Sequence, residues 1–180
     1  MRGIQVPFVL VVVSILTGRV ASAQVTHVGA KPSDHVMLES VGVDPNGTSG
    51  CVVRVSAVEF KRNLLDGTTE QTEGSFQVPT GKVLVVTDFD WSYQAENGTT
   101  AAGTTQVLRL VVQNIADGHF FPVASSTAIL NSEGFGAATE SMTGGFVLSS
   151  KARLCAAVSP GSEDRLNFLH VRGYLTKEEK

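Results

Sequence analysis

Short apolar runs, rich in Val and Thr and separated by Gly, Asn and Asp, recur along most of this chain and constrain its fold. Apolar residues at helical spacing are hard to find in any window longer than two turns. Repeated short strands with turn residues between them are typical of a sandwich or barrel. The sequence therefore predicts an all-β, antiparallel β-sandwich, with a barrel as the alternative. The expected strands lie near residues 35–43, 51–60, 75–79, 82–93, 105–115, 119–130, 145–150, 153–159 and 165–175.

Several turns between these strands have a clear local cause. The Val-Pro-Thr-Gly sequence at 78–81 favours a turn because proline fixes φ and glycine follows it. Asn97 and Asp117 each precede a glycine between two apolar runs, which predicts a long-looped hairpin at the first and a tight hairpin at the second. Pro122 predicts an edge strand, because proline has no N–H to donate. The segment 61–74 is compatible with a loop, a short helix or a hairpin.

Alternation assigns the faces of the expected strands. In the strand at 82–91 the odd-numbered residues, which include Trp91, share one face and the even-numbered residues share the other. Large aromatic side chains fill cores, so Trp91 is expected to be buried. In the next strand Leu108, Leu110 and Val112 form an inner row. The face of the last strand stays open, because apolar residues occur at both parities.

The first 23 residues have the layout of a secretory signal peptide. Arg2 precedes an apolar run at 6–16, and small residues at 21–23 form a cleavage site. The apolar run is shorter than the roughly 20 residues of a transmembrane helix. We expect a secreted or periplasmic protein whose mature part, 24–180, is a single domain. An uncleaved N-terminal anchor is the alternative.

Cys51 and Cys155 are the two cysteines of the chain. In an exported protein an even cysteine count favours a disulfide, and two cysteines allow one intramolecular pairing. A bridge that closes a loop of about 100 residues stabilises the fold by about 4.7 kcal/mol in the chain-entropy model. Two buried free thiols are the alternative. The spacing contains no CxxC, so it supports neither a redox site nor a zinc site.

The charge of the mature chain excludes some classes of partner. Without Arg2 and Arg19 the chain keeps 12 of its 14 basic residues against 17 acidic ones, a net charge of −5. An acidic chain without a basic cluster is a poor binder of nucleic acid. No membrane association is expected after signal cleavage, and no cofactor is expected, because the phosphate-loop and dinucleotide fingerprints are incomplete.

Asp88 and Asp90 are the most suggestive polar residues. On one strand face two carboxylates in a D-x-D pattern lie ~6.5–7 Å apart, a spacing compatible with Ca²⁺ or with the carboxylate pair of a hydrolase. Acidic residues at the end of an apolar run more often mark the point where a strand leaves the core. The favoured interpretation is therefore structural, with Asp88 and Asp90 as weak metal candidates and no catalytic residue assigned.

Tyr93 and Asn97 are the candidate ligand contacts. Tyr93 precedes the polar loop around Asn97, and an aromatic residue at the rim of a sandwich can stack on a sugar ring, with core filling as the alternative. Asn46 and Asn97 both match the N-glycosylation sequon, but both also match ordinary Asn-Gly turns, which are the favoured interpretation.

Three segments resemble those of small exported bacterial β-sandwich proteins of uncharacterised function. They are FQVPTGKVLVVTD from residue 76, GGFVLSS from residue 144 and the closing GYL at 173–175, so the resemblance spans about 75–175. It implies a jelly-roll-like fold and export, and it implies no catalytic residue.

Taken together, these features predict a secreted or periplasmic binding or structural protein, with a glycan or a protein as its unidentified ligand. A carbohydrate-binding module that uses Tyr93 is the first alternative. A hydrolase that uses Asp88 or Asp90 is the second.

Overall fold

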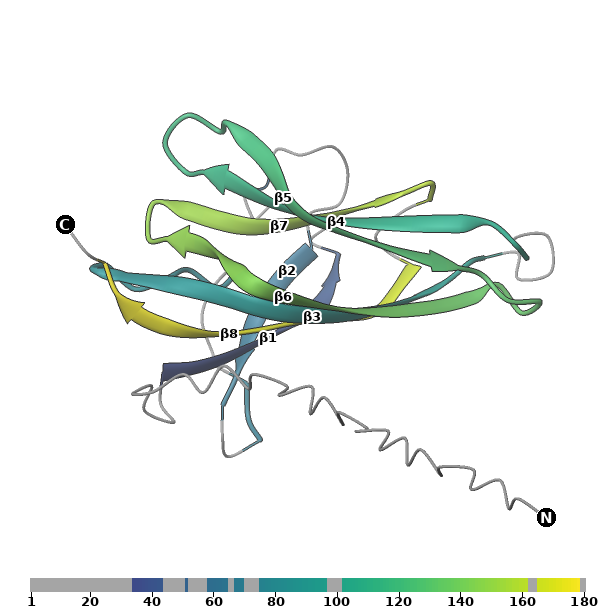
Figure 1. The fold of residues 1–180 in the computed structure, drawn as a ribbon, viewed down its shortest axis with the longest axis horizontal. Helices are drawn as coiled ribbons and strands as arrows, with labels where there is room; N and C mark the ends of the chain where they lie inside the picture. The colour runs from purple at the N-terminus through teal and green to yellow at the C-terminus, as the bar shows by residue number, and fades with distance from the viewer. Residues whose placement is uncertain are drawn as a thin grey trace, which may run out of the picture.

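The computed structural model describes residues 34–43, 51, 58–64, 67–69, 75–96, 102–161 and 165–178. Within these ranges the chain forms eight β-strands and no α-helix, which confirms the all-β prediction (Figure 1). The same ranges hold no helix of the length and hydropathy that a membrane span requires. The strands are β1 (His35–Val43), β2 (Val58–Asn63), β3 (Lys82–Gln94), β4 (Thr105–Asn114), β5 (Phe120–Ile129), β6 (Phe135–Ser149), β7 (Ala152–Ser159) and β8 (Leu166–Lys177).

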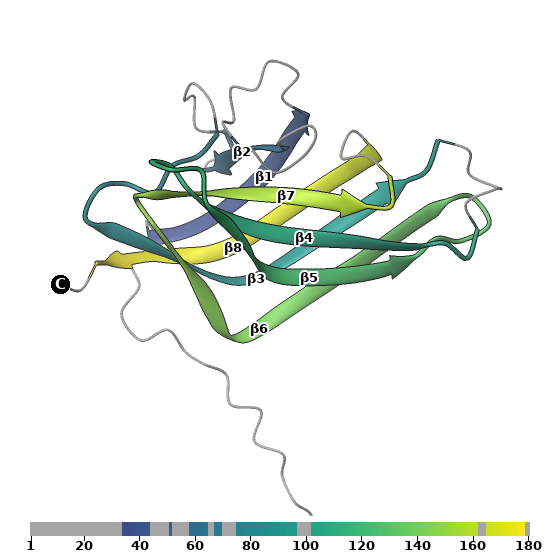
Figure 2. The ribbon, with the colours of Figure 1, turned by 90° about the horizontal axis from the view of Figure 1, so that it is seen from above.

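The strands form two antiparallel sheets that pack face to face (Figures 1 and 2). The larger sheet has five strands in the order β2-β1-β8-β3-β6, and the smaller has three in the order β5-β4-β7. The predicted antiparallel sandwich is therefore confirmed. This strand order is compatible with a jelly roll. In an ideal jelly roll the strand that corresponds to β2 belongs to the smaller sheet and pairs with β7. In this structure β2 pairs with β1 in the larger sheet and also contacts β7.

The core lies between the two sheets and is built from alternate residues of each strand. Leu108, Leu110 and Val112 of β4 face it, as their alternation predicts. Trp91 of β3 is fully buried, also as predicted. Its indole N–H donates a 2.9 Å hydrogen bond to the hydroxyl of Ser126 on β5, so one buried bond connects the two sheets.

A β-bulge between Val86 and Asp88 changes which residues of β3 face the core. Leu84 and Val86 are buried before the bulge, and Phe89 is buried after it. The prediction that the odd-numbered residues of 83–91 share one face is therefore wrong. An extra residue in one strand shifts the alternation by one position, and every side chain beyond it changes face.

Two glycines on the neighbouring strands make room for this bulge. A Cβ atom on Gly173 of β8 would collide with the carbonyl oxygen of Val85, and one on Gly145 of β6 would collide with that of Val86. Because the strands on both sides of β3 carry glycine at the bulge, its position depends on three separate segments of the sequence.

Two of the predicted turns are confirmed. The Lys82 N–H donates to the carbonyl of Pro79 at 3.0 Å, which closes the turn at 78–81. The tight hairpin between β4 and β5 is closed by the Asn114 N–H and the His119 carbonyl at 2.8 Å. Pro122 lies on β5, an edge strand of the smaller sheet, as the missing N–H predicts.

Other local predictions need correction. The expected hairpin at Asn97 is wrong, because β3 and β4 belong to different sheets, and Asn97 itself lies outside the described residues. Residues 75–79 are not a strand, and β6 begins at Phe135 rather than near 145. In the segment 61–74, which the sequence left open, β2 ends at Asn63, and the Leu64 N–H donates to the Thr68 carbonyl at 2.7 Å.

The Cys51–Cys155 disulfide is formed, with 6.1 Å between the two Cα atoms. Cys155 lies on β7 and is fully buried, while Cys51 precedes β2. The alternative of two free thiols is therefore excluded, and the bridge ties the connection between β1 and β2 to the smaller sheet.

Candidate functional site

Polar side chains cross the outer face of the larger sheet, which we define as the side turned away from the smaller sheet. The register of β3 and β8 places Asp90 beside His170 and Asp88 beside Arg172. On the other side of β8, His170 lies opposite Glu39 of β1. These residues share one face because the apolar residues of β8 alternate with them and point into the core.

Four of these residues form the outer-face network, which consists of Asp88, Asp90, His170 and Arg172. Arg172 Nη1 donates to Asp88 Oδ1 at 2.9 Å, and Arg172 Nη2 pairs with Asp90 Oδ1. His170 Nδ1 lies 3.1 Å from Asp90 Oδ2. One guanidinium therefore bridges the two carboxylates, and His170 holds the second of them from the other side.

Arg172 is the permanent positive charge of this network. The hydrogen bond to Asp88 is the largest cause that raises the pKa of Arg172 above its ordinary value, and the bond and charge of Asp90 act in the same direction against partial burial. The planar guanidinium has a fork of donors that can serve two carboxylates at once, which the single ammonium of a lysine does less well.

Two neighbouring contacts hold the network in place. The Thr87 hydroxyl donates to Asp88 Oδ2 at 2.9 Å. The imidazole of His170 stacks on the ring of Phe168, with 4.9 Å between centroids and 14° between planes. Both contacts come from strand residues rather than loops, so they restrict the rotamers of the charged groups.

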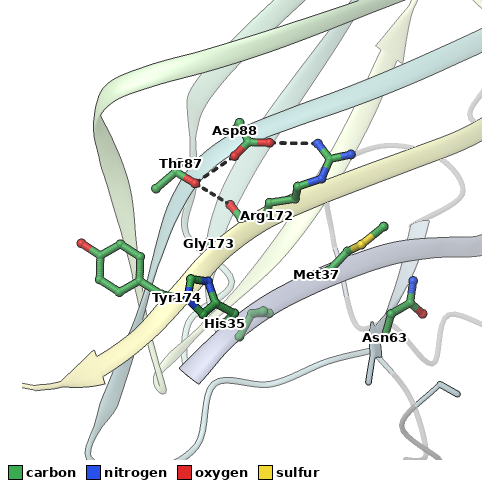
Figure 3. Close-up of a pocket in the computed structure, with 9 residues that line it drawn as sticks. His35, Met37, Asn63, Thr87, Asp88, Arg172, Gly173 and Tyr174 are labelled. Carbon is green, nitrogen blue, oxygen red and sulfur yellow. Dashed lines mark hydrogen bonds and ion pairs between the residues drawn. The ribbon is translucent and has the colours of Figure 1, made fainter. Parts of the chain in front are cut away.

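A pocket of about 320 Å³ opens beside one end of this network (Figure 3). Asp88 and Arg172 form one side of it, and Asp90 and His170 are not part of its lining. Its other sides come from β1, β2 and the end of β8, so four strands of the larger sheet contribute. Its full lining consists of His35, Val36, Met37, Asn63, Thr87, Asp88, Arg172, Gly173 and Tyr174.

The candidate residues that the sequence singled out do not all lie at one site. Asp88 and Asp90 do lie on one outer face and are drawn together by Arg172. Tyr93 is 4% exposed and packs in the core, so it offers no surface for a ligand, and that prediction is wrong. It has the same parity as Trp91 beyond the bulge and therefore points the same way. Asn97 and Asn46 lie outside the described residues.

Sequence reasoning missed His170, Arg172 and Tyr174 as site residues. The signal was present, because these three residues alternate along the last strand with apolar ones. The positive charge of Arg172 also complements the negative charges of Asp88 and Asp90. What the sequence could not supply was the pairing of β3 with β8, two strands about 80 residues apart, as the separation of His170 and Asp90 shows.

The described residues contain no group of three or more His, Cys, Asp or Glu side chains that could hold a metal ion. The carboxylates that the sequence marked as weak calcium candidates are instead bonded to Arg172 and His170. The chain matches no protein-family model and no curated protein. The functional argument therefore rests on the geometry of the outer face.

Proposed function

We propose that the protein is a binding protein that holds a small polar ligand in the outer-face pocket without transforming it. The observation that carries this proposal is the pocket of about 320 Å³, in which the bonded pair Asp88–Arg172 lies beside Tyr174 and His35. Ligand pockets begin at about 300 Å³ and combine apolar or aromatic walls with a few placed polar groups.

The same geometry argues against the hydrolase alternative. Hydrolysis of a glycosidic bond needs two carboxyl groups that flank the bond, one of them protonated. Here only Asp88 lines the pocket, and Arg172 bonds both Asp88 and Asp90.

The test is a ¹⁵N–¹H NMR titration of the folded protein with mixtures of small polar molecules. Binding in the pocket should shift the amide signals of the outer-face residues of β8 and β1, and leave those of the β4–β5 hairpin in place. Proton spectra of the same mixtures, followed over days, should show no new products. Product formation that the Asp88→Asn variant abolishes would support the hydrolase instead.

Export is the second part of this proposal. The disulfide between Cys51 and Cys155 supports an oxidising compartment, since cytosolic thiols are normally kept reduced. The signal-like segment 1–23 and the resemblance to small exported proteins support the same location. Expression of the full chain in an exporting bacterial host should yield a mature protein whose intact mass corresponds to a start at Gln24. Retention of residues 1–23 on a membrane-bound product would contradict this expectation and support the uncleaved anchor.

A further inference from the structure

We propose that the outer-face pocket binds the ring of a neutral carbohydrate, and that Asp88 and Arg172 hold two adjacent hydroxyl groups of that ring. This inference rests on the proposed function, because it names the ligand class of the same pocket. It moves the sugar contact from Tyr93, which is buried, to a different strand and a different face of the sandwich.

The apolar part of the pocket suits one face of a sugar ring. Tyr174 of β8 and His35 of β1 are direct register partners, and Met37 follows on the same face of β1. All three line the pocket (Figure 3). A pyranose ring exposes aliphatic C–H groups on its flat faces, which pack on the electron-rich face of an aromatic ring or on a polarisable thioether.

The polar part of the pocket offers both acceptors and donors. Asp88 accepts one bond from Arg172 and one from Thr87, so among the described residues its carboxylate keeps capacity for about two more. The guanidinium of Arg172 has five N–H donors, and the contacts to Asp88 and Asp90 use two of its nitrogens. A hydroxyl group is both donor and acceptor. One hydroxyl can therefore donate to Asp88 while its neighbour accepts from Arg172.

The charge of the network selects against acidic ligands. Asp88 and Asp90 carry two negative charges against one positive charge on Arg172, so the three groups sum to −1. A carboxylate or phosphate placed against Asp88 would be repelled, and the positive charge of Arg172 is already shared by two aspartates. A neutral polyol brings no charge into the pocket and avoids this repulsion.

The polar groups of the network already hold one another in place without the ligand. Arg172 is held by both carboxylates, Asp88 by Thr87, and Asp90 by His170. Preorganised polar groups lose little conformational freedom on binding, which is what a small ligand with few contacts requires.

The experiment is a ¹⁵N–¹H NMR titration of the wild-type protein with methyl glucoside, methyl mannoside, methyl galactoside and N-acetylglucosamine, and with glucuronate as the acidic counterpart. At least one neutral sugar should bind with shifts centred on Tyr174 and Arg172, and glucuronate should bind about tenfold more weakly or not at all. Tyr174→Leu and Asp88→Asn should each weaken the neutral sugar by about tenfold or more, the equivalent of about 1.4 kcal/mol. Tyr174→Phe, which keeps the ring, should retain most of the affinity.

Two control variants match these changes. Asp117→Asn removes a carboxylate at the tip of the β4–β5 hairpin, and Thr139→Ala alters the same outer face on β6, so neither should affect sugar binding. Sugar binding that persists in Tyr174→Leu and Asp88→Asn would overturn the site. Failure of every sugar, when other polar molecules still shift the pocket signals, would overturn the ligand class and leave the proposed function standing. If no molecule of either panel binds, both proposals fail.

Discussion

Arg172 joins two aspartates on a neighbouring strand, and this makes it the residue on which the outer face depends. Without its guanidinium the two carboxylates would face each other on adjacent outward positions of β3 with no bonded cation. His170 would still contact Asp90, but among the described residues Asp88 would keep only the hydrogen bond from the Thr87 hydroxyl. The consequence is a measurable loss of stability even though the group is 38% exposed.

We expect Arg172→Gln to lower the free energy of unfolding by about 1 kcal/mol, because exposed ion pairs each contribute up to about that amount. In a domain of this size that corresponds to a fall of roughly 2–4 °C in the thermal midpoint. The triple variant with Asp88→Asn and Asp90→Asn should recover most of the loss, since it removes the uncompensated charges as well. Circular dichroism melting at low and high salt measures both. If Arg172→Gln were as stable as the wild-type protein at low salt, the network would make no contribution to the free energy of unfolding.

Ser126 is the second residue with a specific role, because its hydroxyl accepts the buried N–H of Trp91 from the opposite sheet. Ser126→Ala leaves that N–H buried without its partner, which costs about 1–3 kcal/mol. Thr127→Ala, the next residue of β5 and exposed, is the matched control and should change stability by less than about 0.5 kcal/mol. Urea unfolding followed by tryptophan fluorescence compares the two. Equal effects of the two substitutions would contradict a role for the bond.

At the scale of elements, the bulge in β3 decides which side chains reach the outer face. It lies where the glycines of β8 and β6 allow the carbonyl groups of Val85 and Val86 to approach. Because it shifts the alternation by one residue, Phe89 and Trp91 stay in the core with Leu84 and Val86, while Asp88 and Asp90 turn outwards.

The bulge can be tested through its glycines. Gly173→Ala should destabilise the fold by about 1–3 kcal/mol, because the new methyl group meets the Val85 backbone and the strands must separate to admit it. Gly144→Ala on β6 is the control, since a Cβ atom there meets nothing within 4 Å. Chemical denaturation gives the two values. If Gly173→Ala were as stable as Gly144→Ala, the close packing around the bulge would be wrong.

At the scale of the whole molecule, the disulfide joins residues 104 positions apart and fastens the segment before β2 to the smaller sheet. Loops of this length are costly to close, so the bridge removes much of the freedom of the unfolded chain. In the part of the chain that the structure describes, the buried Trp91–Ser126 hydrogen bond and the packing of side chains in the core also join the two sheets.

Replacement of both cysteines by alanine should lower the free energy of unfolding by about 2–4 kcal/mol, the usual range for a native bridge. The effect should be much larger than that of adding a reductant to the double variant, which has no bridge left to break. Urea unfolding with and without reductant measures both proteins. If the double variant were as stable as the wild-type protein, the disulfide would make no contribution to the free energy of unfolding.

Particular residues show how much of the fold could be predicted from the sequence. The turns at 78–81 and at Asp117 followed from proline and glycine dihedrals, and the inner row of β4 followed from its alternation. The sequence did not reveal that β3 and β4 lie in different sheets, nor that β6 begins at Phe135, because that stretch is rich in small residues without an apolar alternation.

The sequence by itself determined the all-β class, the disulfide partners, the tight turns and the burial of Trp91. These depend on composition, on local dihedral preferences and on the cost of exposing a large aromatic side chain. Only the tertiary structure decided that β3 pairs with β8, that a bulge sets the faces of β3, and that Asp88 therefore meets Arg172 beside a pocket. Strand pairing joins residues far apart in the chain, and its register depends on the packing of the whole sandwich rather than on any one segment.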